Sequence, residues 1–102
     1  MMKIFKISQH LKNVETLDTL TDRELTRALR DAIIAEEDAI KQYETIVDST
    51  DSEQAKKVLQ HIADEERVHV GELQELLDRL LPDEQELLEE GRKEVKEELG
   101  EE

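Results

Sequence analysis

The sequence contains no cysteine and no tryptophan, and only one proline and three glycines interrupt its 102 residues. Without cysteine there can be no disulfides, zinc ribbons or iron–sulfur clusters. Phe5 and Tyr43 are the only aromatic residues, so any core must be aliphatic. No apolar run approaches the roughly 20 residues of a membrane span, and the first residues are too poor in apolar side chains for a signal peptide. These absences predict a cytoplasmic protein with no membrane partner.

Negative charge dominates the chain, which has 28 Asp and Glu against 14 Lys and Arg and a net charge of −14. This balance argues against the phosphate backbone of a nucleic acid as partner, because such binding relies on clustered basic residues. The acidity is greatest in residues 82–102, where it would attract cations, although solubility alone also explains it. With 41% charged residues, the composition favours long amphipathic helices.

Short local signals divide the chain into helices. Thr21 followed three residues later by Glu24 predicts a capping box at the start of a first helix. The polar run 48–52 predicts a turn, and Pro82 ends the second helix. We therefore predict an all-α protein with three parts. These are an N-terminal extension (1–20), an antiparallel helical hairpin (21–81), and an acidic C-terminal helix and tail (82–102).

Charged residues interrupt the apolar faces of both long helices. Steps of four and three give Leu25, Leu29, Ala32, Glu36, Ala39, Tyr43 and Ile46 in the first helix. The same steps give Leu59, Ile62, Glu66, His69, Leu73, Leu76 and Leu80 in the second. Glu36, Glu66 and His69 are the exceptions in these ladders. A buried carboxylate without a partner costs several kcal/mol, and a metal ion would supply that partner.

The spacing of these three residues predicts a single cluster. Glu66 and His69 are at positions i and i+3, so both side chains can converge on one ion. Glu36 lies near the middle of its helix and comes to the same level in an antiparallel hairpin. The alternative without a metal is a buried Glu66 paired with His69 or with a neighbouring Lys or Arg. His61 lies beside the ladder, and we expect it to be a solvated surface residue rather than a metal ligand.

The cluster is half of a known type of metal site. Helical-bundle di-iron sites take one Glu from each of two helices and a Glu-x-x-His pair from each of two others. The third segment has no histidine, so a second copy of the chain is the simplest way to complete the set and the four-helix bundle. Mixed carboxylate and imidazole ligation suits iron or manganese better than copper. The alternative to a metal-binding protein is a non-catalytic oligomerisation module, in which Glu36, Glu66 and His69 form a buried polar layer.

The sequence resembles the encapsulated ferritins, short ferritin-like proteins related to the rubrerythrins. The resemblance covers residues 25–99, and its motifs are Ala-Glu-Glu-Asp-Ala-Ile at 35–40, Tyr-Glu at 43–44 and Glu-Glu-Arg-Val-His at 65–69. It implies a ferritin-like four-helix bundle completed by dimerisation and a ring of dimers, typically decameric, inside an encapsulin shell. By this resemblance the iron ligands are Glu36, Glu66 and His69, with Tyr43 beside them.

The resemblance also implies an activity, namely a ferroxidase that oxidises Fe(II) to Fe(III) with oxygen for iron storage or detoxification in an encapsulin nanocompartment. A rubrerythrin-like peroxidase is the chemical alternative, although no cysteine is present for a rubredoxin-type electron carrier. Tyr43 would bond to an iron ligand or fill core space. Some relatives carry an aromatic residue just before the tyrosine and additional carboxylates that form a metal entry site. At the corresponding positions this chain has Gln42, Ala35 and Asp38. The tail lacks the apolar peptide that usually docks such cargo into a shell, whereas some relatives are fused to the shell protein instead.

Overall fold

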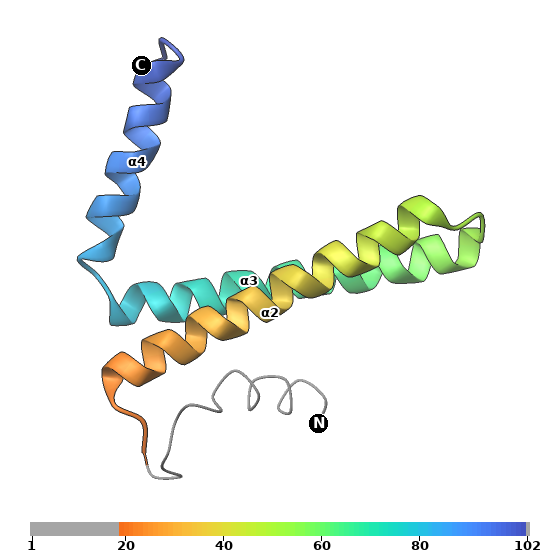
Figure 1. Cartoon of the computed structure of the whole chain (residues 1–102), viewed down its shortest axis with the longest axis horizontal. Helices are drawn as coiled ribbons and strands as arrows, with labels where there is room; N and C mark the ends of the chain where they lie inside the picture. The colour runs from red at the N-terminus through yellow and green to blue at the C-terminus, as the bar shows by residue number, and fades with distance from the viewer. Residues whose placement is uncertain (1–18, 102) are drawn as a thin grey trace.

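The computed structural model describes residues 19–101, which contain three helices and no strand. The helices are α2 (Asp22–Ser49), α3 (Glu53–Leu80) and α4 (Glu84–Glu98). α2 and α3 form an antiparallel hairpin, and α4 turns sharply away from its end (Figure 1). The predicted all-α class is confirmed. The N-terminal extension predicted for residues 1–20 lies outside the described residues except for its last two.

The predicted helix boundaries arise from local hydrogen bonds. The hydroxyl of Thr21 accepts from the backbone N–H of Glu24 at 3.1 Å, and the Glu24 carboxylate accepts from the backbone N–H of Thr21 at 2.9 Å. This capping box satisfies two amides that would otherwise lack partners at the start of α2. Ser52 caps α3 by accepting from the N–H of Ala55 at 3.1 Å. α3 ends two residues before Pro82.

The core lies between α2 and α3 and is small. Its buried apolar side chains are Ala28, Leu29, Ala32, Ala39, Ile40, Ala63 and Leu77. Alanines make up more than half of this set, and they let the two backbones approach closely while burying little apolar area. The hairpin is therefore a slender scaffold whose helices lie close together along their length.

The predicted ladder of α3 does not form the centre of this core. Ala63 and Leu77, which lie beside the ladder, are 0% and 1% exposed, whereas the ladder residue Leu76 is 46% exposed. Ile46, the last member of the α2 ladder, is also 46% exposed. The face of α3 that packs on α2 is therefore offset from the predicted ladder toward Ala63 and Leu77, although the ladder residue Glu66 is buried. One neighbouring helix cannot cover so wide an apolar face, so Leu76 and Ile46 stay exposed in the single chain.

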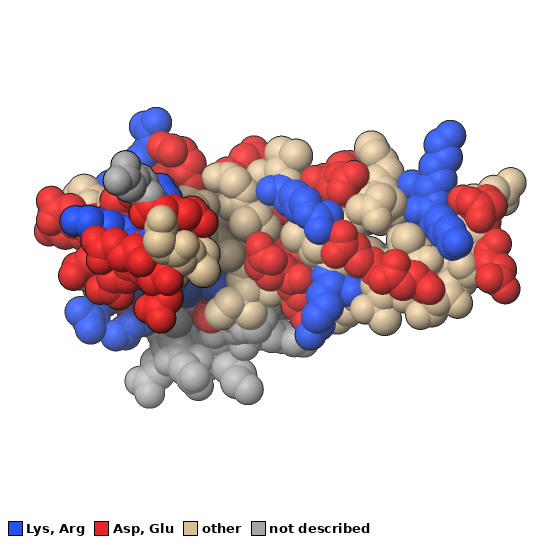
Figure 2. All heavy atoms as spheres, turned by 90° about the horizontal axis from the view of Figure 1, so that it is seen from above, with Lys and Arg blue, Asp and Glu red and all other residues tan. Residues whose placement is uncertain are grey.

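α4 is an arm with no buried residue. Its first turn is tied to α2 by an ion pair between Arg30 and Glu84. Leu87, Val95 and Leu99 are 68%, 59% and 66% exposed. Figure 2 shows Asp and Glu side chains gathered at the α4 end of the molecule. Among the described helices, none is long and apolar enough to cross a membrane.

Candidate metal centre

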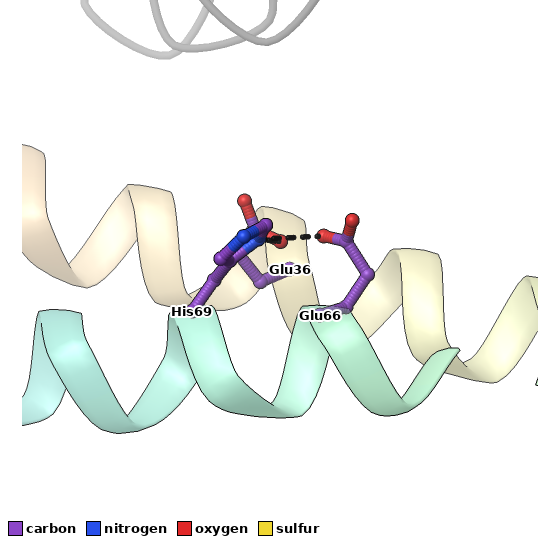
Figure 3. A group of neighbouring side chains, drawn as sticks. All are labelled: Glu36, Glu66 and His69. Atoms are coloured by element: carbon purple, nitrogen blue, oxygen red, sulfur yellow. Dashed lines mark hydrogen bonds and ion pairs between the residues drawn. The ribbon is translucent and has the colours of Figure 1, made fainter. Parts of the chain in front are cut away.

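Side chains from both helices of the hairpin meet in one group. Glu36 comes from α2, and Glu66 and His69 come from α3 (Figure 3). Each residue offers one ligand atom, and these atoms lie within 4.8 Å of one another. The Nδ1 atom of His69 lies 3.4 Å from Oε2 of Glu36 and 3.7 Å from Oε2 of Glu66. The predicted cluster is therefore confirmed as a spatial group, and its role as a ligand set stays a prediction.

Small residues around the cluster explain how the two helices bring it together. Ala32 and Ala39 lie one turn before and after Glu36, and Ala63 lies one turn before Glu66. All three alanines are buried between the helices. Their small side chains allow the backbones to approach, so carboxylates from facing helices reach the same ion-sized space. The i, i+3 spacing on α3 then places His69 on the same side as Glu66.

The cluster holds two carboxylates in a largely dehydrated place. The side chains of Glu66 and Glu36 are 10% and 12% exposed, and that of His69 is 38% exposed. One imidazolium can balance only one carboxylate, so the group retains negative charge in either protonation state of the histidine. Two oxygen donors and one nitrogen donor are the ligand types that iron, manganese and zinc accept in proteins. The residues present thus fit a divalent cation, and three donors leave coordination positions open.

Sequence reasoning missed an ion pair beside the cluster. Nη2 of Arg67 lies 2.6 Å from Oε2 of Glu44, and Nη1 lies 3.2 Å from Oδ1 of Asp64. The hydrogen bond to Glu44 is the main cause that raises the pKa of Arg67. Because Arg67 is next to Glu66 in α3, this pair ties α2 to α3 at the level of the site. No spacing rule could have found it, since Arg67 and Glu44 are 23 residues apart.

Two other predicted residues lie outside the three-residue group. Tyr43 is half-buried on α2, two turns beyond Glu36, and its hydroxyl makes no hydrogen bond to another described residue. Its place beside the site stays a prediction. His61 has a side chain that is 73% exposed, and its Nε2 lies 2.8 Å from Oε1 of Glu65. His61 is therefore a surface residue in this chain, as expected.

Known proteins share this hairpin. The family model described as Rubrerythrin matches residues 27–100. The encapsulin nanocompartment cargo protein EncC of Myxococcus xanthus is 50% identical over 64 residues, which are 63% of this chain and 49% of that protein. The ferritin-like-encapsulin shell fusion protein of Pyrococcus furiosus is 45% identical over 80 residues, which are 78% of this chain and 23% of that protein. The chain thus spans half or less of the length of these two relatives.

A solved structure supports the same relationship. The crystal structure of the encapsulated ferritin domain from Pyrococcus furiosus aligns with a TM-score of 0.81 and 42% sequence identity. The alignment covers 86% of this chain and 90% of that chain. Sequence and fold therefore agree over nearly the whole described region. The chain belongs to the rubrerythrin family and, within it, to the encapsulated ferritins.

Proposed function

We propose that the chain is a ferroxidase that oxidises Fe(II) to Fe(III) with oxygen at a di-iron site shared between two copies. The observation that carries this proposal is the convergence of ligand atoms from Glu36, Glu66 and His69 within 4.8 Å in a place of low exposure. Membership of the rubrerythrin family supports it. Iron is the substrate of this reaction, and the three residues form one half of its binding site.

Charge supports a second copy as the source of the other half. Each chain provides two carboxylates and one imidazole, so two chains provide four carboxylates with a formal charge of −4. Two Fe(II) ions carry the opposite charge, and a neutral dehydrated site avoids the cost of burying excess charge. The apolar residues left exposed near the site, Leu76 and Val68 among them, give the second copy a surface to cover. We therefore propose a homodimer as the active unit, within a decameric ring.

The residues act through position and charge. Glu36 and Glu66 would bind Fe(II) through oxygen atoms, which favour the higher charge of Fe(III) and so assist oxidation. His69 would add a nitrogen ligand, and its contacts with Glu36 and Glu66 would help to orient their carboxylates toward the iron. Each Fe(II) would give up one electron, and four such electrons with four protons from the solvent would reduce one O2 to two molecules of water. Helices hold the ligands, so little rearrangement is needed when iron binds.

We further propose that the oxidised iron is stored in an encapsulin compartment. Support comes from the names of two relatives, an encapsulin cargo protein and a fusion to an encapsulin shell. Figure 1 shows a two-helix hairpin with an arm directed away from it, and a mineral would need a compartment that a pair of helices does not provide. The acidic α4 would raise the local concentration of cations. The encapsulin shell is therefore the partner that we propose beside the second copy.

The oxidation test uses two histidines of the same helix. The rate of Fe(II) oxidation in air is followed by absorbance for the unmodified chain, His69→Ala and His61→Ala. We expect His69→Ala to lose most of the rapid oxidation, while His61→Ala, which changes only an exposed residue, retains it. A Glu66→Ala/His69→Ala double variant should be little worse than either single change, because both act on one ion. Unmodified rates in His69→Ala would remove His69 from the site.

The storage test loads the purified chain aerobically with a large excess of Fe(II) in the absence of any shell. Oxidation without an enclosing compartment should produce insoluble Fe(III), so we expect iron in the pellet after centrifugation. A stable iron core that remains in solution with the chain alone would contradict the proposed need for a compartment. This result would leave the ferroxidase activity itself intact, so the two proposals fail separately.

A further inference from the structure

A groove lies where α2 begins and α3 ends, at the far end of the hairpin from the α2–α3 turn (Figure 1). It has a volume of about 370 Å³. We define it as the arginine groove by its lining residues, Asp22, Arg23, Thr26, Arg27, Arg30, Leu80 and Leu81. Its arginines recur at steps of four and three, so they share one face of α2. Three arginines against one aspartate make this lining positive, in a chain whose net charge is −14.

Two of these arginines lack, within the described chain, the carboxylate partner that the other arginines have. The paired arginines are Arg30, Arg67, Arg79 and Arg92. Arg23 and Arg27 are exposed, and neither forms an ion pair with another described residue. Glu24, one turn before Arg27, binds the backbone N–H of Thr21 at 2.9 Å instead. Although acidic residues outnumber basic ones by 28 to 14, two neighbouring guanidinium groups are thus not neutralised by the described residues.

The spacing of Arg23 and Arg27 suits a small tetrahedral anion. Four residues of helix separate the two positions by about 6 Å along the axis, a distance that two long side chains can close around one ion. Each guanidinium presents N–H donors in a planar fork that matches two phosphate oxygens. Leu80 and Leu81, half-buried at the end of α3, give the groove an apolar wall that limits competition from water. We propose that the arginine groove binds inorganic phosphate between Arg23 and Arg27.

Asp22, which lines the same groove, selects the form of the anion. An ionised carboxylate accepts hydrogen bonds and donates none. Hydrogenphosphate carries an O–H group that can donate to Asp22, whereas sulfate carries no proton near neutral pH and is only repelled by the carboxylate. Asp22 therefore favours hydrogenphosphate over sulfate, although the two anions have nearly the same shape and equal charge. This selection gives a use to a negative charge that would otherwise only weaken the site.

Bound phosphate stabilises the end of the hairpin opposite the turn. The arginines belong to α2 and the two leucines to the end of α3, so the complete groove exists only when both helices are packed. A ligand that binds only the folded chain raises its stability, and the unfolding midpoint rises with it. The groove is separate from the metal centre, because Arg27 precedes Glu36 by nine residues, about 13 Å along α2. Phosphate binding therefore requires no iron.

Calorimetric titration of inorganic phosphate into the full, metal-free chain tests the proposal, with sulfate titrated in parallel. We expect phosphate to bind more tightly than sulfate, and Asp22→Asn to remove this preference. Arg23→Gln/Arg27→Gln should weaken phosphate binding by about tenfold or more, because charge-assisted hydrogen bonds from both guanidinium groups are lost. Phosphate should raise the unfolding midpoint of the unmodified chain and leave that of Arg23→Gln/Arg27→Gln unchanged.

The matched control is Lys93→Gln/Lys96→Gln, which removes the same charge from exposed residues of α4 outside the groove. We expect its phosphate affinity to stay within about twofold of the unmodified value, because distant surface charges are screened. Far-ultraviolet circular dichroism checks that every variant remains helical. Absence of phosphate binding, unchanged binding by Arg23→Gln/Arg27→Gln, or an equal loss in the lysine control would overturn the proposal, and equal affinities for phosphate and sulfate would overturn the selection by Asp22. The titration contains no iron, so its outcome is independent of the ferroxidase test.

Discussion

Replacing Glu66 with Gln tests whether the cluster of Glu36, Glu66 and His69 binds a cation or stabilises the folded chain. The ligand atoms of Glu36 and Glu66 lie within 4.8 Å of each other. Two unit charges at that separation repel by about 3 kcal/mol at an effective dielectric constant of about 20, and His69 offsets part of this when it is protonated. Gln keeps the size of the side chain and removes its charge. We therefore expect the metal-free variant to have an equal free energy of unfolding, or one higher by about 1 kcal/mol.

The same variant should lose its response to metal. A ligand that binds only the folded protein stabilises it by about 2.7 kcal/mol at 100 times its dissociation constant. For a chain of this size, that corresponds to a rise of roughly 10 °C or more in the unfolding midpoint. The assay is thermal unfolding by circular dichroism with EDTA, Mn(II) or anaerobic Fe(II). Glu72→Gln, an exposed carboxylate of the same helix, is the control and should keep the full metal response.

The result that would refute this reasoning is a large loss of stability without metal. Breaking a buried ion pair that holds a fold together costs about 3–5 kcal/mol, because one charge is left uncompensated. If metal-free Glu66→Gln lost that much, and Mn(II) raised neither protein's midpoint, the three residues would be a structural polar layer. The non-catalytic oligomerisation module would then be the better description of the chain.

Other outcomes follow from individual contacts. Leu77→Ala should lower the free energy of unfolding by about 2–5 kcal/mol in denaturant titrations, since Leu77 is 1% exposed. Arg67→Gln removes the tie to Glu44, and it should weaken Mn(II) binding several-fold in calorimetric titrations while costing at most about 1 kcal/mol of stability. A hydrogen bond from the backbone N–H of Thr21 lowers the pKa of Glu24 below its usual 4.5. Its stabilisation is present above pH 4.5 and is lost as the pH falls through the lowered value, so Glu24→Gln should flatten this part of the acid unfolding curve.

Features set by neighbouring residues could be predicted from the sequence. The capping box at Thr21 depends only on contacts three residues apart, and Pro82 restricts the residue before it. The meeting of Glu36 with Glu66 and His69 was also predictable. The turn between α2 and α3 is so short that residues near the middle of each helix must face one another.

Features set by packing could not be predicted in the same way. The apolar ladder of α3 shows which residues avoid water, but it does not say which of them face α2 and which face another chain. Ala63 and Leu77 face α2 in this structure, and Leu76 does not. The direction of α4 depends on the geometry after Leu80 and on the contact between Arg30 and Glu84, which are 54 residues apart. No periodic pattern contains that information.

Binding of a second copy together with iron would both enlarge the small apolar core and neutralise the negative charge of the Glu36, Glu66 and His69 cluster. The hairpin buries mainly alanines and leaves Ile34 and Val58, at 57% each, in solvent. It also holds two carboxylates beside one imidazole. Under the proposed function, a second copy covers apolar surface and completes the ligand set, and the iron balances the charge of both halves. Metal binding, dimerisation and folding are then thermodynamically coupled. The factor by which bound metal raises the association constant of the dimer equals the factor by which dimerisation raises the affinity for metal. Removal of metal therefore weakens the dimer, and dilution of the protein weakens metal binding.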